Sequence, residues 1–374
     1  MMNLLDWIHN SNFFVNYGYS FDILVPMKVR SVIVGTICVF FLLACISNDT
    51  STSDFPERSS MVNDSRIQAS SDQSSNNPSI MLINYSSYPT KDIEFWIQIA
   101  ESKMASRTSN IFAFIYPVGK QIEPFAPVKS HYADGVFGKH EVLLKPEEIE
   151  FILREVEEWL RNDPCIEHHR DSKDEIDNHL SDYRTWLEQG ADASTMHGVC
   201  SSARVVGMGI TYNMREHEPL MEFQDFLFHE FYHAFQQDLE MEGECQDRRD
   251  DEENSNSVWL VEGGAHYFST HLITELNNIP NPRSRILEIA DRNYKREGHH
   301  IGPDKWGAAA LLLMVEKDMI TEESILDGTL FHNCDRELKF GRDNPNMQRI
   351  KDSWHLIEKS GEGYEFQSGV ISTN

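Results

Sequence analysis

Residues 228–235 read FHEFYHAF and set two histidines and a glutamate among bulky apolar side chains. Apolar residues recur at helical spacing on both sides of this stretch, which predicts a helix over residues 221–239. On a helix, residues four positions apart lie on one face, about one turn from each other. His229 and His233 therefore share a face, and Glu230 lies beside the first of them.

Two interpretations of this stretch are open. The histidines can be satisfied polar residues inside an apolar helix, or their imidazoles can bind one zinc ion at about 2.0–2.1 Å. In the second case Glu230 stays off the metal and takes the proton from a water molecule whose pKa the metal lowers. An HExxH pattern alone does not decide between the two, because a catalytic zinc site takes a third protein ligand.

A second stretch offers that ligand. Residues 258–267 read VWLVEGGAHY, and 28 residues lie between His233 and Glu262. HExxH followed by WLxEGxAxY resembles the gluzincin metallopeptidases, especially the aminopeptidase-like branch of the thermolysin-type superfamily. The resemblance implies that Glu262 is the third zinc ligand, on a second helix that we predict over residues 258–276.

The resemblance also implies a fold. It covers about residues 203–320 and leads us to expect an α+β, thermolysin-like zincin core, with a mixed sheet that carries an edge strand and a helical zinc-binding half. The β-rich residues 203–212 are predicted to form a strand. Residues 205–212, just before the zinc helix, take the place of the family's substrate-pairing edge strand. A purely structural strand is the alternative.

Small residues in the second motif have a physical use. Gly263, Gly264 and Ala265 are expected to let the second helix approach the first, so that the Glu262 carboxylate reaches the ion.

Two features of the sequence depart from the family pattern. The spacing between the motifs is longer than in the best-known members, with the excess in an acidic loop where insertions cost little. The glycine-methionine-glutamate-asparagine motif that holds a substrate amino terminus in the aminopeptidases is absent.

The family also places a Tyr or His downstream of the third ligand, where it stabilises the transition-state oxyanion. Tyr294, His299 and His300 are the candidates here, with Tyr294 and His300 taken forward as catalytic residues. Exposed loop residues are the alternative for each. His266, one turn after Glu262, is either a partner of the metal ligands or a packing residue.

Other segments predict strands and helices that have a structural rather than a chemical role. Residues 111–116 are a short apolar run that predicts a strand. An amphipathic pattern with Pro146 in its first turn predicts a helix over residues 146–161. Helices are also predicted over residues 171–189 and, apolar nearly all round and therefore buried, over residues 306–319.

The N-terminal part of the chain predicts export. A short basic stretch, Met27 to Arg30, precedes 14 mostly apolar residues, 31–44, which is the layout of a signal peptide over residues 27–44 and too short for a membrane span. The run ends in LLAC and resembles the lipobox of bacterial lipoproteins, with Cys45 as the lipidated residue. A signal anchor with a coincidental cysteine is the alternative.

This interpretation divides the rest of the chain. Residues 1–26 become an upstream extension that is not native, and the Ser-, Asn- and Asp-rich residues 45–80 become a flexible tether. Residues 81–200 are assigned to an α/β N-terminal part of the catalytic domain, and residues 201–374 to the zinc-binding part. Isoleucine rather than aspartate after Cys45 resembles lipoproteins sorted to the outer membrane, so we expect a lipid-anchored protein of the bacterial cell envelope.

Charge and cysteine content add two expectations. The formal net charge of −27 repels phosphate backbones, so a nucleic acid is not expected as a partner. In an exported chain the four cysteines outside the signal region permit two disulfides, in three possible connectivities that the sequence leaves open. They are Cys165, Cys200, Cys245 and Cys334.

Together these patterns predict a zinc-dependent hydrolase that acts on peptides or proteins, with Zn²⁺ held by His229, His233 and Glu262 and with Glu230 as general base. The alternative from another class is an envelope lipoprotein in which the zincin fold serves binding rather than catalysis. Oligomeric state and cleavage preference are not specified by any of these patterns.

Overall fold

The computed structural model describes residues 14–15, 79–104, 110–129, 134–168, 172–197, 199, 203–211, 219–242, 258–298, 301–331 and 345–371. All of them belong to one compact unit of the chain. Cys45 and the predicted signal peptide and tether up to residue 78 lie outside the described residues, so these assignments stay predictions.

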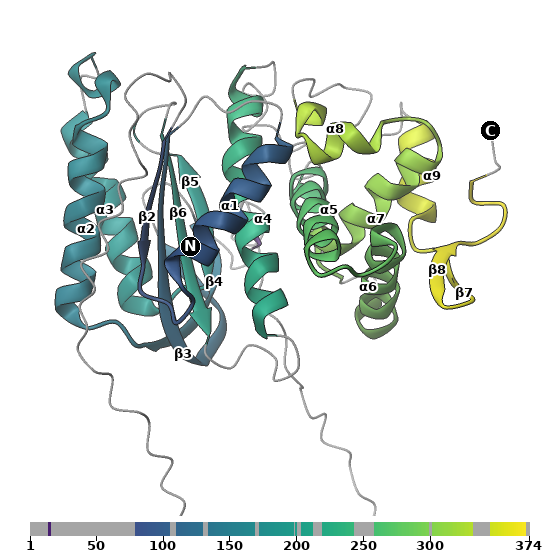
Figure 1. The fold of residues 1–374 in the computed structure, drawn as a ribbon, viewed down its shortest axis with the longest axis horizontal. Helices are drawn as coiled ribbons and strands as arrows, with labels where there is room; N and C mark the ends of the chain where they lie inside the picture. Colours follow the sequence, from purple (N-terminus) through teal and green to yellow (C-terminus); the bar gives the residue numbers. More distant parts are fainter. Residues whose placement is uncertain are drawn as a thin grey trace, which may run out of the picture. The chain divides into compact units, whose positions relative to one another are not determined.

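A six-stranded mixed sheet forms the centre of this unit (Figure 1), with the order β1-β4-β3-β6-β5 and with β2 also paired to β3. The long strand β3 runs parallel to β2 and β6 and antiparallel to β4, and β5 runs antiparallel to β6. The strands are β1 (Phe14–Val15), β2 (Ile80–Asn84), β3 (Asn110–Lys129), β4 (Asp134–Val142), β5 (Ala193–His197) and β6 (Ala203–Thr211).

The predicted strand at residues 205–212 is present as β6, but its placement at the edge of the sheet is wrong. β6 lies between β3 and β5, and residues 203–210 are all buried. Its nearly continuous apolar sequence is typical of a strand that is covered on both faces. The strand next to it, β5, pairs with β6 on one side only within the described residues, so β5 is the edge strand.

The two faces of β3 supply two hydrophobic cores. Side chains alternate along a strand, so neighbours in the sequence point to opposite faces. Phe112, Phe114 and Tyr116 join one cluster, with α2 (Pro146–Arg161) and α3 (Ser172–Gln189). Ile111, Ala113 and Ile115 join the other, with α1 (Thr90–Lys103) and α4 (Pro219–Glu242).

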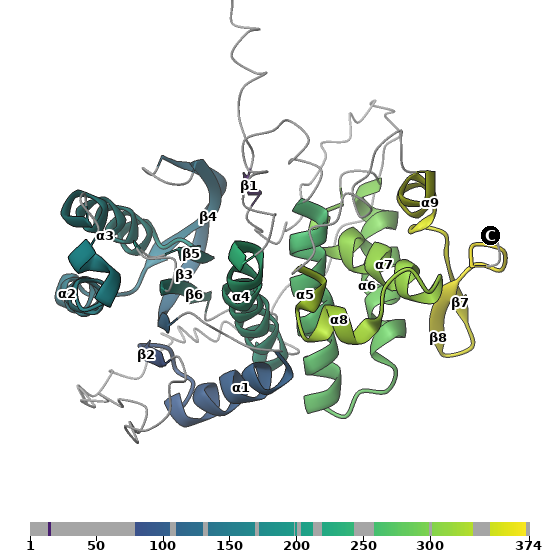
Figure 2. The same cartoon turned by 90° about the horizontal axis from the view of Figure 1, so that it is seen from above.

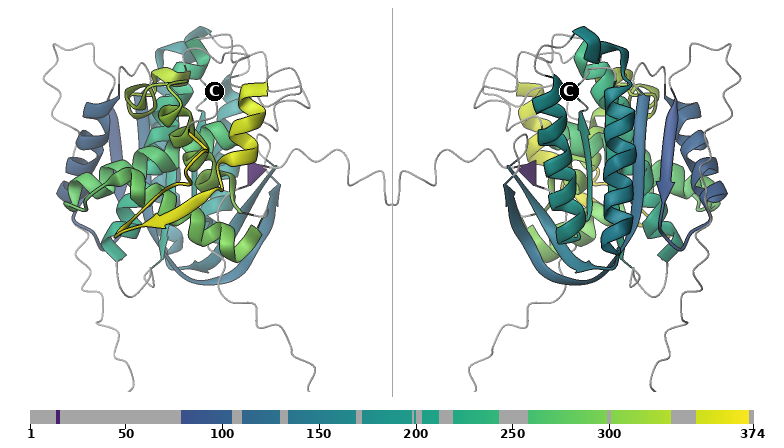
Figure 3. Two further views of the ribbon diagram at one scale, coloured as in Figure 1. Left: turned by 90° about the vertical axis from the view of Figure 1, so that its right-hand side faces the viewer. Right: turned by 90° about the vertical axis from the view of Figure 1, so that its left-hand side faces the viewer.

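Helical layers therefore cover both faces of the sheet. Figure 2 shows α2 and α3 on one side and α1 and α4 on the other, and the right-hand view of Figure 3 shows α2 and α3 side by side. The predicted helix over residues 146–161 matches α2, and the one over residues 171–189 matches α3 to within one residue.

Beyond α4 the chain is mainly helical. α5 packs on α4 and on α7, and α7 also packs on α6 and α9. The predicted helix over 258–276 matches α5. The helix predicted over 306–319 is present as α7, but it begins at Pro303, because proline fits the first turn of a helix, and it ends at Glu316. These elements are α5 (Val258–Leu276), α6 (Pro282–Glu297), α7 (Pro303–Glu316), α8 (Glu322–Leu326), α9 (Pro345–Ser353) and the hairpin of β7 (Ile357–Ser360) and β8 (Gly363–Phe366).

The fold is thus mixed, with helices on both faces of a mixed sheet and a helical half after it, which is compatible with the predicted α+β class. Among the described residues, no helix combines the length and the apolar character that crossing a membrane requires.

Candidate metal centre

Helix α4 carries both histidines of the first motif. It lies between the sheet, where it contacts β5 and β6, and helix α5. Many of its apolar residues are fully buried, among them Phe223, Leu227, Phe228, Phe231 and Phe235. This apolar surface anchors the helix, while His229 and His233 keep 15% and 12% of their side-chain surface exposed.

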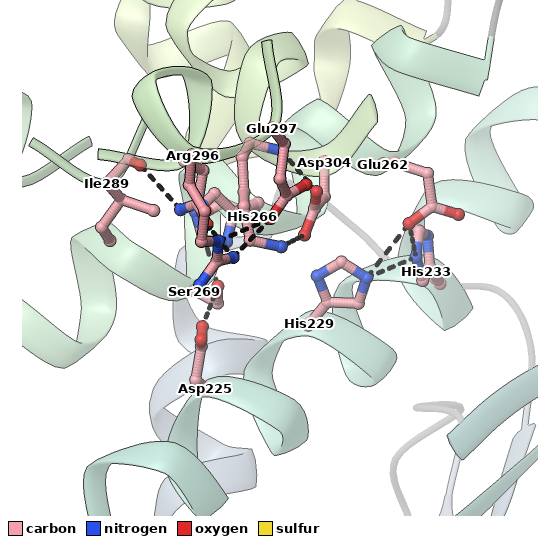
Figure 4. Close-up of polar contacts among 12 residues, drawn as sticks. Asp225, His229, His233, Glu262, His266, Ser269, Ile289, Arg296, Glu297 and Asp304 are labelled. Atoms are coloured by element: carbon pink, nitrogen blue, oxygen red, sulfur yellow. Dashed lines mark hydrogen bonds and ion pairs between the residues drawn. The ribbon is translucent and has the colours of Figure 1, made fainter. Parts of the chain in front are cut away.

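The two histidines and Glu262 of α5 bring three ligand atoms together (Figure 4). Nε2 of His229 lies 3.0 Å from Nε2 of His233 and 3.2 Å from Oε2 of Glu262. Nε2 of His233 lies 3.4 Å from the same oxygen. In a tetrahedral zinc site with donors about 2.0–2.1 Å from the ion, neighbouring donors are about 3.3–3.4 Å apart. The three donors therefore lie close enough together to hold one metal ion, at separations near those of a tetrahedral zinc site.

The electrostatics of this group show how closely the three side chains interact. Burial alone would lower the pKa of His233, but the Glu262 carboxylate and then the charge of Glu230 raise it to about 9. Burial alone would raise the pKa of Glu262, but His233 and His229 hold it well below its usual range. A cation bound by these atoms would take the place of the proton that the carboxylate now stabilises on His233.

Glu230 is held next to this group by the edge strand. The carboxylate is buried, with 8% of the residue exposed. The hydroxyl of Thr195 on β5 lies 3.0 Å from Oε2 of Glu230 and 2.9 Å from its backbone carbonyl oxygen. The sequence motifs give no indication of Thr195, because β5 is a short strand that lies outside both of them.

Glycines of the second motif place α5, but not all in the predicted way. A Cβ atom on Gly263 would lie 2.5 Å from the backbone carbon of Gly307, so this glycine allows α5 to cross α7 rather than α4. A Cβ on Gly264 would meet side chains, with Phe331 at 3.0 Å and Tyr232 of α4 at 3.3 Å. Only Gly264 therefore faces α4, and the expectation for Gly263 is corrected.

The buried side-chain amide of Gln236 links the two motif helices. Nδ1 of His233 lies 2.9 Å from Oε1 of Gln236, and Nε2 of Gln236 donates to the carbonyl oxygen of Val261 at 3.2 Å. Gln236 is only 1% exposed. The residue is visible in the sequence three positions after His233, but nothing in the motif itself indicates its role.

His266 lies in a buried polar region beside the three ligands. The residue is 5% exposed, and its Nε2 has no hydrogen-bond partner among the described residues. Burial lowers its pKa, while Asp225 and Asp304 oppose that shift. Figure 4 shows the ring near Asp304 and Ser269. No hydrogen bond joins His266 to the metal ligands in the described residues, so its predicted role as their partner stays a prediction.

Of the predicted oxyanion donors, only Tyr294 lies within the described residues, and it is not one of the three residues that converge. Tyr294 lies on α6 with its ring 5.4 Å from that of Trp354 and 5.0 Å from that of His355. His299 and His300 lie outside the described residues. A catalytic role of Tyr294 or His300 remains a prediction.

No family model matches the chain, and neither does any curated protein or solved structure. The resemblance to the gluzincins therefore rests on the two sequence motifs and stays a prediction.

Proposed function

We propose that this protein is a zinc-dependent hydrolase that acts on peptides or proteins. The observation that supports it is the convergence of His229, His233 and Glu262 on one position, with the carboxylate of Glu230 beside them. Three protein ligands leave a fourth position open in a tetrahedral site, which is typical of catalytic rather than structural zinc. This favours catalysis over a zinc site kept only for binding.

Glu230 has the position of a general base. A zinc ion held by the three ligands would lower the pKa of a water molecule and polarise the carbonyl of a substrate. Thr195 occupies Oε2 of Glu230, which leaves Oε1 to exchange a proton. Glu230 would accept the proton of the attacking water and then pass it to the leaving amine.

The edge strand β5 supports a peptide as the substrate. An extended peptide can pair with the backbone of an edge strand, and side-chain pockets then supply specificity. β5 also carries Thr195, which contacts Glu230. A peptide paired to β5 would therefore run past the general base.

The test is the Glu230→Gln substitution in the full chain. We expect one zinc per chain, measured by metal analysis, and a loss of peptide hydrolysis of about 10²–10⁴-fold, measured on a peptide library. The Glu222→Gln variant makes the same change two turns earlier on α4 and should retain activity. A chelator should abolish hydrolysis by the wild type and by Glu222→Gln. Full activity of Glu230→Gln would contradict the proposed function.

The place of this activity is a separate proposal. Lipidation at Cys45 would anchor the protein to the bacterial envelope, at the outer membrane. The disulfide bond at Cys165 supports an exported protein, because disulfides persist in oxidising compartments. A Cys45→Ala variant should lack the lipid, as measured by mass spectrometry, and should no longer be found in the membrane fraction. A membrane-bound Cys45→Ala protein would contradict the lipid anchor but not the hydrolase.

A further inference from the structure

We infer that Gln236 is a positioning residue of the metal centre, which fixes the proton and the ring of His233 and couples this ligand to the backbone beside Glu262. The inference rests on the proposed zinc site but not on hydrolysis. Gln236 lies three residues after His233 on α4, which places both side chains on the same face of the helix.

The hydrogen bonds determine which way the amide of Gln236 points. A backbone carbonyl oxygen can only accept a hydrogen bond, so the group that faces Val261 must be the NH₂ group of the amide. The amide oxygen then faces His233, at 2.9 Å from Nδ1. Since this oxygen is also only an acceptor, Nδ1 must carry a proton.

This arrangement prepares the other nitrogen of the ring for a metal. With the proton fixed on Nδ1, neutral His233 has its lone pair on Nε2. Nε2 is the atom that lies 3.0 Å from His229 and 3.4 Å from Glu262, at the position of the proposed ion. Gln236 thus selects both the tautomer and the orientation that zinc binding requires.

The same side chain joins the two ligand-bearing helices. Its NH₂ group holds the carbonyl of Val261, the residue immediately before Glu262. One amide therefore connects a ligand from α4 with the backbone that carries the ligand from α5. Because Gln236 is 1% exposed, loss of either hydrogen bond would leave a polar group buried without its partner.

The chain contains a matched control. Gln224 is a second buried glutamine on α4, 2% exposed, and its Oε1 accepts a hydrogen bond of 3.2 Å from Asn277, just beyond the end of α5. It also links α4 to the α5 region, but it does not contact a metal ligand through any hydrogen bond in the described structure. Gln224→Met therefore measures the cost of losing a buried amide link alone.

The experiment measures zinc affinity in the full-length, metal-free protein by competition with a chromophoric chelator. We expect Gln236→Met to weaken zinc binding about 10–100-fold, as for other partners of ligand histidines, and Gln224→Met to change it by less than about threefold. Gln236→Glu keeps an acceptor for His233 but loses the donor to Val261, so its affinity should lie closer to that of the wild type.

Thermal unfolding of the metal-free proteins completes the test. Both methionine variants should lose comparable stability, because each loses one buried amide. Equal zinc affinity of Gln236→Met and wild type would overturn the inference, and so would an equal loss of affinity in the two methionine variants. A wild-type chain that binds no zinc would overturn the metal site and the inference together. A chain that binds zinc in the expected order but hydrolyses no peptide would leave the inference intact and contradict only the proposed function.

Discussion

The helical layers on the two faces of the sheet each contain a histidine near a carboxylate, buried for His179 and largely buried for His233, and the two histidines differ in almost every other respect. His179 of α3 lies near Asp182, yet burial lowers its pKa to about 4. For His233 of α4 burial also lowers the pKa, but the combined influence of Glu262, Glu230 and Gln236 exceeds it, and the pKa rises to about 9.

The difference is one of geometry rather than of residue type. The ring of His179 stacks on that of Tyr183 at 6.0 Å, within the core of α2 and α3. His233 instead faces a second imidazole and a carboxylate, with donor atoms 3.0–3.4 Å apart. A buried histidine with an acidic neighbour therefore indicates a metal site only where several donors converge on one position.

The largest expected effect is on zinc affinity, in a variant that takes one donor away from the group of three. Glu262→Gln takes away the negative ligand, and the loss should exceed that for a partner of a ligand histidine, on the order of a thousandfold in zinc affinity, or about 4 kcal/mol. Chelator competition measures it. Asp182→Asn makes the same acid-to-amide change beside His179 and should leave zinc affinity unchanged. Zinc binding of wild-type strength in Glu262→Gln would remove Glu262 from the ligand set.

The next effect concerns His179 and pH. Its pKa of about 4 in the folded chain lies below the ordinary 6.5, so the unfolded chain binds more protons between these values. The contribution of neutral His179 to the free energy of unfolding is therefore fully present above pH 6.5 and is lost as the pH falls to about 4. The total loss is limited to about 3 kcal/mol. Denaturant unfolding at several pH values should show a shallower pH dependence for His179→Gln than for wild type. Parallel curves would show that His179 does not titrate as described.

A smaller effect tests how the site side is packed. Gly263→Ala gains about 1 kcal/mol of helix propensity, but its Cβ would lie 2.5–2.8 Å from backbone atoms of Gly307 and Ala308. Backbone moves less readily than side chains, so we expect a net loss of about 2 kcal/mol, or a Tm lower by about 3 °C in a unit of this size. Gly264→Ala meets only side-chain atoms at 3.0 Å and beyond and should be nearly neutral. Equal Tm values for the two variants would contradict the close crossing of α5 and α7.

The two layers also differ in what the sequence revealed. The amphipathic pattern of α2 is local, so its bounds could be predicted to the residue. The three candidate ligand positions could also be predicted, because two short motifs contain all of them, and the structure brings the three residues together. The partner of Gly263 was not readable, since Gly307 lies on another helix. Likewise β6 could be identified as a strand, but its interior position depends on the pairing of β5, which no local pattern specified.

Thr195 is the residue of the site that was hardest to predict from the sequence. Its substitution has the smallest expected effect, a fall in kcat. Thr195→Val keeps the shape of the side chain and removes the hydroxyl that bonds to Glu230. A net hydrogen-bond contribution of about 1 kcal/mol corresponds to a fall in kcat of about fivefold. Steady-state kinetics with metal analysis should show this fall at unchanged zinc content.

Thr195→Ser retains the hydroxyl and is the control, which should keep nearly the full kcat. A wild-type kcat in Thr195→Val would mean that the hydroxyl does not hold Glu230 during turnover. In that case β5 would contribute only its backbone to the site. A fall in kcat that serine restores would instead make β5 a strand with two roles, because the strand proposed to pair with the substrate would also hold the base that acts on it.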